Sequence, residues 1–222
     1  DTSHLHGLFY KVCNFLQMGI IPIFVLDGKP PDAKKETIKN RNELLRKTKQ
    51  QISELMKVEQ TEEVKKEILT LKKKSVRMNG YHTRELKNLF DLMGIQHYQA
   101  NGEGETGCVW LVQNGYADYV LTEDMDTLAY GCPRLIRRNV ERKGNKDFVS
   151  VFNYDLILKH MNLTPQQFRD MCILSGSDYT TSIPRLGSHS AYKFIKQCGT
   201  LEEVLKELEF RDYKDIPPLK FA

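Results

Sequence analysis

The sequence lacks the features that mark membrane and secreted proteins. No stretch of eighteen apolar residues predicts a transmembrane helix, and no signal peptide is recognisable. The five cysteines are odd in number and form no C-x-x-C pair, so neither a disulfide framework nor a structural zinc site is expected. No internal repeat or low-complexity tract is present. We therefore expect a monomeric globular domain in a reducing intracellular compartment, with no membrane contact.

Basic residues are concentrated in one segment. Between Lys29 and Arg77 the sequence holds 15 Lys and Arg against 8 Asp and Glu, whereas the whole chain of 222 residues holds 33 against 29. Residues 34–78 are also rich in Glu, Gln and Leu, which predicts exposed helix. A solvated helix face with mixed charges explains this composition as readily as a surface for a polyanion.

Apolar runs and helical periodicity alternate along the chain. Strands are predicted at 20–26, 94–100, 119–121, 135–140 and 148–152, although Pro22 weakens the first. Helices are predicted at 83–93, at 105–113, after the N-cap pair Thr164-Pro165 as far as Gly176, and after a capping box at 200–203. This order predicts an α/β fold with a mostly parallel central sheet flanked by helices.

Acidic residues recur where these elements begin or end. Asp27 follows the first strand, Asp124 and Asp126 follow the third, and Asp178 follows a helix. Glu103 and Glu105 stand at the start of another helix. Ligands bind at the carboxyl ends of strands in open α/β sheets, which makes these positions suited to a site.

Each acid also has a structural explanation when it is taken alone. An aspartate after a strand often caps a turn, and two glutamates at a helix start favour the helix dipole. Six clustered carboxylates, however, repel one another unless cations neutralise them. Oxygen ligands without His or Cys select Mg²⁺ or Mn²⁺. The set therefore predicts a divalent-metal site.

Four motifs occur in the order found in flap endonucleases. They are V-L-D-G-K-P-P at 25–31, G-E-G-E at 102–105, T-E-D-M-D at 122–126 and L-S-G-S-D-Y at 174–179. The opening T-S-H-L-H-G-L-F-Y-K is also similar, so the resemblance covers nearly the whole chain. It implies the 5′-nuclease, PIN-like fold as a single nuclease domain over 1–222, with a basic helical arch at 29–80.

The resemblance also implies two-metal-ion hydrolysis of DNA phosphodiesters. One Mg²⁺ or Mn²⁺ would lie among Asp27, Glu103 and Glu105, and the other among Glu105, Asp124, Asp126 and Asp178. Glu123 and Asp155 match no motif. The family has a further metal-binding aspartate in an N-terminal strand, and a C-terminal tail that binds a sliding clamp. Both segments are expected to be missing from these residues, by truncation at both ends.

Basic residues of the arch receive roles through the same resemblance. Lys34 and Arg41 are seven residues apart, which predicts one helix face, and they match residues that draw the scissile phosphate onto the metals. Lys35 and Lys39 lack such a match. Lys73 and Arg77, at i and i+4, would contact a single-stranded 5′ end.

Residues 165–200 resemble the family's helix-two-turn-helix, which grips duplex DNA. Ser182, Gly187 and Ser188 would contact its phosphates, and Ser182 would help to hold K⁺. The sequence departs from the family at Arg185, which replaces the first turn glycine.

The implied function is a structure-specific 5′ flap endonuclease, a metal-dependent phosphodiesterase acting on branched or flapped DNA in replication and repair. A 5′ to 3′ exonuclease of the same family is the alternative within this class. A non-catalytic DNA-binding module that kept the fold is the alternative from another class, but degraded acidic motifs would be its signature and all six acids are intact. The expected location is the nucleus or a viral replication site.

Overall fold

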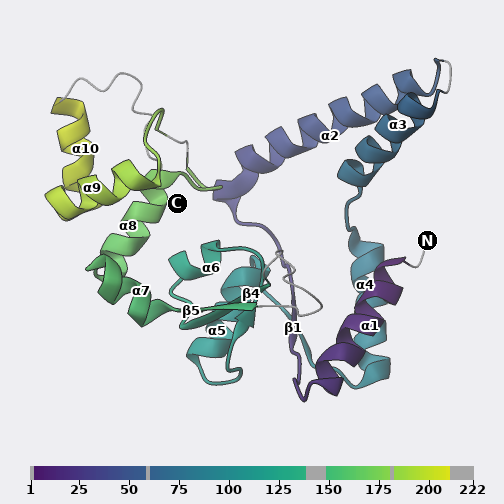
Figure 1. The fold of residues 1–222 in the computed structure, drawn as a ribbon, viewed down its shortest axis with the longest axis horizontal. Helices are drawn as coiled ribbons and strands as arrows, with labels where there is room; N and C mark the ends of the chain where they lie inside the picture. The colour runs from purple at the N-terminus through teal and green to yellow at the C-terminus, as the bar shows by residue number, and fades with distance from the viewer. Residues whose placement is uncertain (1–2, 59–60, 139–148, 181–182, 211–222) are drawn as a thin grey trace. The chain divides into compact units, whose positions relative to one another are not determined.

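The structure, a computed structural model, describes residues 3–58, 61–138, 149–180 and 183–210. The chain divides into two compact units (Figure 1). Unit 1 comprises residues 1–24 and 34–97, and unit 2 comprises residues 25–33 and 98–222. No helix in the described ranges is long and apolar enough to cross a membrane.

Unit 1 contains a packed pair of helices, α1 (Ser3–Gln17) and α4 (Gly80–Met93). Val12 of α1 and Phe90 of α4 are buried, and Phe90 also stacks on Phe24 with ring centroids 4.5 Å apart. Helix α4 begins at a capping box in which the Asn79 side chain accepts backbone N–H bonds and the His82 ring accepts one from Asn79. It ends at Gly94, as the sequence predicts.

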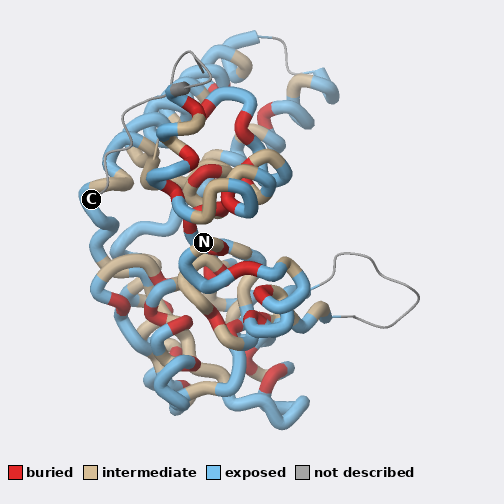
Figure 2. Tube along the Cα trace, turned by 90° about the vertical axis from the view of Figure 1, so that its left-hand side faces the viewer, coloured by how far each residue is buried: buried red, intermediate tan, exposed pale blue. Residues whose placement is uncertain are grey.

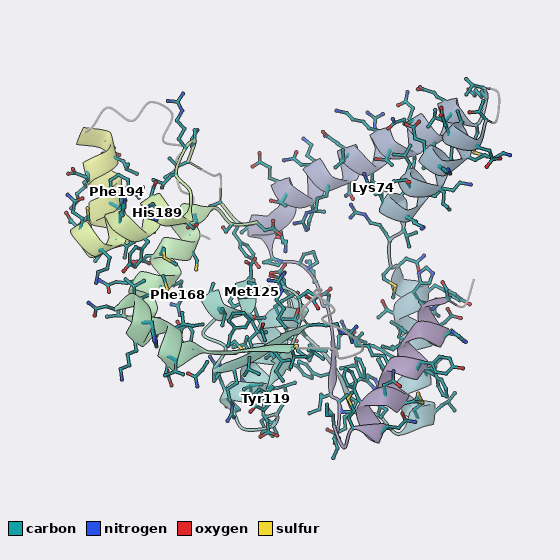
Figure 3. All side chains as sticks on the ribbon, viewed as in Figure 1. Lys74, Tyr119, Met125, Phe168, His189 and Phe194 are labelled. Atoms are coloured by element: carbon teal, nitrogen blue, oxygen red, sulfur yellow. The ribbon has the colours of Figure 1, made fainter. Side chains whose placement is uncertain are left out.

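The basic segment folds as a helical hairpin in unit 1. A 3₁₀ turn, η1 (Asp32–Lys34), precedes α2 (Lys35–Leu55), and α3 (Glu62–Ser75) packs along α2. Ile52 and Ile68 are the buried residues of the two helices, so almost all the charged side chains face solvent. Figure 3 shows these side chains, including that of Lys74, projecting from the two helices.

Five strands form two small sheets. β1 (Phe24–Leu26) pairs with β2 (His97–Gln99), and β3 (Val120–Leu121) runs parallel to β4 (Arg134–Arg138). β5 (Val149–Asn153) runs antiparallel to β4. Each predicted strand is found, but the first two are shorter than predicted, since residues 20–23, which include Pro22, lie outside β1 and residues 94–96 lie outside β2. In the described residues the strands form two small sheets rather than one large one, and β5 adds an antiparallel edge to the parallel pair β3 and β4.

Buried residues occur at intervals along the chain (Figure 2), and those of unit 2 form one hydrophobic core. Leu135, Leu174, Ile195 and Leu208 are almost completely buried in this core. The helices are α5 (Gly104–Gln113), α6 (Asp126–Ala129), α7 (Tyr154–Met161), α8 (Pro165–Ser175), α9 (Ser188–Cys198) and α10 (Leu201–Phe210).

Two predicted helix starts in unit 2 are confirmed. Thr164 caps α8 and forms a full capping box with Gln167. At α10 the Thr200 hydroxyl accepts the N–H of Glu203, but the Glu203 side chain pairs with Lys206 at 2.7 Å. A buried carboxylate, Asp170 of α8, instead accepts the N–H of Leu201 and joins α8 to the start of α10.

Candidate metal centre

The first acidic motif meets the second through backbone contacts within unit 2. Asp27 follows β1, and its Oδ1 accepts the N–H of Gly104 at 2.7 Å. A Cβ on Gly104 would stand 2.9 Å from that oxygen, so a larger residue would push the carboxylate away. Gly28 donates its N–H to the Gly102 carbonyl at 2.6 Å, and a Cβ there would collide with the Ala100 carbonyl. Glycines at these positions allow the two motifs to approach closely.

Glu103 and Glu105 lie at the start of α5. Glu103 is the N-cap residue, but its side chain makes no capping bond. Its Oε2 instead accepts the Tyr130 hydroxyl at 3.4 Å. Helix capping therefore does not account for Glu103, although Glu105 in the first turn remains well placed to favour the helix dipole.

The third motif forms a compact turn between β3 and α6. The Thr122 hydroxyl accepts the N–H of Asp124, and Asp124 Oδ1 accepts the N–H of Asp126 at 2.9 Å. Asp126 is the first residue of α6. Figure 3 labels Met125, which separates the two aspartates. One oxygen of Asp124 is thus held by the backbone, which fixes the orientation of its carboxylate.

Asp178 lies in the half-buried segment that follows α8. Helix α8 ends at Gly176, as the sequence predicts. The N–H of Tyr179 is donated to the Ser177 hydroxyl, and the Tyr179 hydroxyl lies 2.7 Å from that of Tyr130. The residue next to Asp178 is thereby linked, through Tyr130, to Glu103.

Electrostatic repulsion shows which carboxylates lie close enough to affect Glu105. Burial raises the pKa of Glu105 above its ordinary value, and the charges of Asp27, Asp124 and Glu103 raise it further. Burial likewise raises the pKa of the Cys108 thiol to about 11, with Glu105 contributing. Three of the six predicted acids therefore act on a fourth, Glu105, within unit 2.

Burial also raises the pKa of Cys172 to about 11, and the charge of Asp126 contributes. Neutral thiols at both positions leave the carboxylates as the charged groups of this region. Their oxygen-only chemistry fits a hard divalent cation, and such a cation would relieve the repulsion at Glu105. Within the described ranges no group of three or more His, Cys, Asp or Glu side chains is already set to hold a metal ion.

Lys34 and Arg41 belong to unit 1 and do not share one α-helix. Lys34 closes the 3₁₀ turn and is the N-cap residue of α2, where it is half-buried. Arg41 is exposed on α2. Helical conformation thus begins directly after Pro31, but its first turn is a 3₁₀ turn, and Lys34 precedes α2 instead of lying within it.

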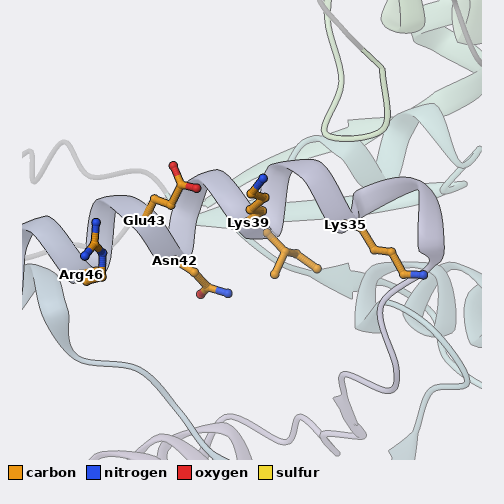
Figure 4. A pocket seen from close by; sticks show the side chains of 6 residues that line it. Lys35, Lys39, Asn42, Glu43 and Arg46 are labelled. Carbon is orange, nitrogen blue, oxygen red and sulfur yellow. The ribbon is translucent and has the colours of Figure 1, made fainter.

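The exposed surface of α2 carries a shallow pocket of about 400 Å³ (Figure 4). Its lining includes Lys35, Lys39 and Arg46, but neither Lys34 nor Arg41.

Lys73 and Arg77 do not form the predicted i, i+4 pair. Helix α3 ends at Ser75, and Val76 adopts an extended conformation. Arg77 therefore lies beyond the helix, and its guanidinium donates to the Arg41 carbonyl at 3.3 Å. This contact joins the two ends of the hairpin.

The segment between α8 and α9 contains the predicted phosphate contacts. Ser182 lies outside the described residues. Gly187 is the N-cap residue of α9 and Ser188 is its first residue, and both are exposed. No side chain caps this helix start, and His189, labelled in Figure 3, is exposed in its first turn.

Two family descriptions match the chain at separate places. The XPG N-terminal domain matches residues 1–50, and the XPG I-region matches residues 94–178, which include all the candidate acids after Asp27. Flap endonuclease 1 of Ostreococcus lucimarinus is 37% identical over 221 residues, and flap endonuclease 1 of Danio rerio is 36% identical over 208 residues. The chain belongs to the flap endonuclease family. The alignments cover 100% and 94% of this chain, but 56% and 54% of those relatives, so the chain spans about half their length.

Solved structures of flap endonuclease relatives have the same fold. The catalytic core of Rad2 in complex with DNA substrate superposes with a TM-score of 0.70 at 26% identity, over 96% of this chain and 60% of that one. Flap endonuclease-1 from Methanococcus jannaschii superposes with a TM-score of 0.65 at 27% identity, over 100% of this chain and 69% of that one. The 5′-nuclease α/β fold is therefore confirmed.

At Arg185, where the sequence departs from the flap endonuclease pattern, the backbone keeps a glycine-like conformation. Arg185 has a φ of 65°, in the left-handed region that favours glycine. The main chain thus takes the turn that a glycine would take, with an exposed cation at that point.

Two residues near the acids were missed by the sequence reasoning. Tyr130 and Tyr179 connect Glu103 to the segment that carries Asp178. The only signal in the sequence is their position, since Tyr130 follows T-E-D-M-D by four residues and Tyr179 ends L-S-G-S-D-Y.

Proposed function

We propose that this chain carries the catalytic centre of a structure-specific 5′ flap endonuclease, which hydrolyses DNA phosphodiesters near the junction of single strand and duplex. The observation that carries the proposal is the contact between two acidic motifs, in which Asp27 accepts the N–H of Gly104, the residue between Glu103 and Glu105. The charges of Asp27, Asp124 and Glu103 all raise the pKa of Glu105, in addition to the effect of burial. Such repulsion costs stability, so it favours a site that binds cations. Cutting flapped DNA in replication and repair would place the protein in the nucleus or at a viral replication site.

Six carboxylates would hold two Mg²⁺ or Mn²⁺ ions. Asp27, Glu103 and Glu105 would serve one ion, and Glu105, Asp124, Asp126 and Asp178 the other. When bound, the ions would supply Lewis-acid stabilisation of the attacking and leaving oxygens. Asp27 and Asp124 each have one oxygen fixed by a backbone N–H, which leaves their other oxygens oriented for ligation.

The basic residues would bring the DNA to this centre. Lys34 and Arg41 would bind the scissile phosphate and stabilise its developing charge. Lys73 and Arg77 of the basic helical hairpin would attract the single-stranded 5′ end without reading its sequence. The α8–α9 region would hold the duplex, with backbone N–H groups at Gly187 and Ser188 contacting phosphate. Ser182 would contribute to the same contact and to a K⁺ site.

The test is cleavage of three substrates by the complete protein with Mg²⁺. A double-flap DNA, the matched blunt duplex without the flap, and the flap strand alone separate the outcomes. We expect a product one or a few nucleotides from the junction, formed fastest from the double flap. Preferential resection of the blunt duplex would favour the exonuclease instead, and the absence of Mg²⁺-dependent product from all three would contradict the enzyme proposal.

A further inference from the structure

Two tyrosines form a hydrogen-bonded chain that ends on Glu103. The Tyr130 hydroxyl, at the end of α6, donates to Glu103 Oε2 at 3.4 Å. The Tyr179 hydroxyl, in the segment after α8, lies 2.7 Å from the Tyr130 hydroxyl. All three side chains are half-buried, and they come from three different elements of unit 2.

The direction of this chain follows from counting protons. An ionised carboxylate can only accept, and each hydroxyl has one proton to donate. When Tyr130 donates to Glu103, the short contact with Tyr179 must be made by the Tyr179 proton. The hydrogen bond that Tyr130 accepts from Tyr179 polarises the Tyr130 hydroxyl and strengthens the bond that it donates to Glu103. The order is therefore Tyr179 to Tyr130 to Glu103.

Glu103 differs from the neighbouring acids in what orients it. Asp27 and Asp124 each have an oxygen bound to a backbone N–H of an adjacent motif or turn. Glu103 has a longer side chain with an additional rotatable bond, and it does not cap the helix on which it stands. Tyr130 gives it the fixed donor that the backbone gives the two aspartates.

We propose that Tyr130 is a positioning residue for the metal centre, which holds the Glu103 carboxylate in the orientation that binds a cation, with Tyr179 supporting it. This inference rests on the proposed function, because it requires Glu103 to be a ligand. Outer hydrogen bonds to metal ligands commonly contribute tenfold or more to affinity. The 3.4 Å contact is long, so we expect an effect of about tenfold.

The experiment measures Mn²⁺ affinity in the complete protein without DNA, by the loss of the free-ion signal in electron paramagnetic resonance. Tyr130→Phe should raise the Mn²⁺ dissociation constant by about tenfold. Tyr179→Phe, which keeps the donor to Glu103, should raise it less. Tyr192→Phe is the matched control, since it removes a hydroxyl that donates to the Met161 carbonyl at 3.0 Å elsewhere in unit 2. Its affinity should equal that of the unmodified protein.

A double-mutant cycle separates positioning from packing. Glu103→Gln removes the ligand, so adding Tyr130→Phe to it should change the affinity no further. The same tenfold loss in both backgrounds would overturn a role through Glu103, and so would an unchanged affinity in Tyr130→Phe alone. If the unmodified protein binds no Mn²⁺, the proposed metal centre fails, and this inference fails with it.

Discussion

The proposed metal centre in unit 2 and the helical hairpin in unit 1 carry opposite charges and are built in opposite ways. The carboxylates lie at element ends that backbone hydrogen bonds and close glycine contacts draw together. The hairpin has one buried side chain on each helix, Ile52 and Ile68, and an exposed charged surface around them. Fixed acids suit chemistry at one point, whereas exposed bases suit attraction along a strand.

Removing one of the proposed metal ligands should have the largest effect on cleavage. Asp124→Asn should lower single-turnover cleavage of double-flap DNA by roughly a thousandfold, because a proposed ligand of the second ion is lost. DNA binding should be retained or strengthened, since a negative charge is removed. Rapid-quench cleavage and fluorescence anisotropy with the same DNA would measure the two quantities.

Glu123→Gln is the matched control, because Glu123 is the neighbouring acid and pairs with Arg137 at 3.4 Å. It should cleave at the normal rate. Lost DNA binding by Asp124→Asn with unchanged turnover would assign the acid to substrate binding instead.

Two basic residues of unit 1 should behave as part of the chemistry. Lys34→Ala and Arg41→Ala should each lower single-turnover cleavage by about a hundredfold, the order seen when one transition-state donor is removed. Lys39→Ala is the control from the same helix, since Lys39 lines the shallow pocket on α2. Equal small losses in all three variants would reduce Lys34 and Arg41 to general attraction.

The remaining hairpin cations should act on binding alone. Lys73→Gln should weaken binding of the flap strand a few-fold and reduce the salt dependence of log K by about 0.7, the value for one phosphate contact on a single strand. Lys65→Gln serves as the control, because Lys65 is already paired with Glu62 at 2.9 Å. Anisotropy titrations at several salt concentrations measure both slopes, and identical slopes would argue against a specific path for the strand.

The smallest effect concerns the stability of the metal-free protein. Because burial and neighbouring acids raise the pKa of Glu105 in the folded state, stability should fall as pH rises from the ordinary value through the raised one. Above that window Glu105→Gln should melt about 1–3 °C higher than the unmodified protein, and below it the two should coincide.

Melts in chelator at pH 4 and pH 7, with the exposed Glu67→Gln as control, would check this prediction. A Glu105→Gln protein that is less stable at pH 7 would contradict the repulsion on which the metal centre rests.

The two regions also differ in how far the sequence predicts them. Acids at Asp27, Asp124 and Asp178 follow apolar runs or a periodic helix, so the ends of those elements could be located from local patterns. The hairpin is helical as predicted, but the extended conformation of Val76 separates Lys73 from Arg77. Nothing in the helix-forming composition of that segment marks Val76 as a break.

Contacts between residues far apart in the sequence could be identified only from the structure. Tyr130 lies 27 positions from Glu103 in the sequence and 49 positions from Tyr179, so no local pattern predicts its hydrogen bond to either residue. The antiparallel pairing of β4 and β5 likewise depends on which strands become neighbours.

Cleavage of double-flap DNA before and after restoring Mg²⁺ to the chelator-treated complete protein tests the central claim most directly. The account predicts no cleavage in chelator and full recovery with Mg²⁺, because the six carboxylates are proposed to act only through bound ions. Cleavage at the same rate in chelator would contradict it.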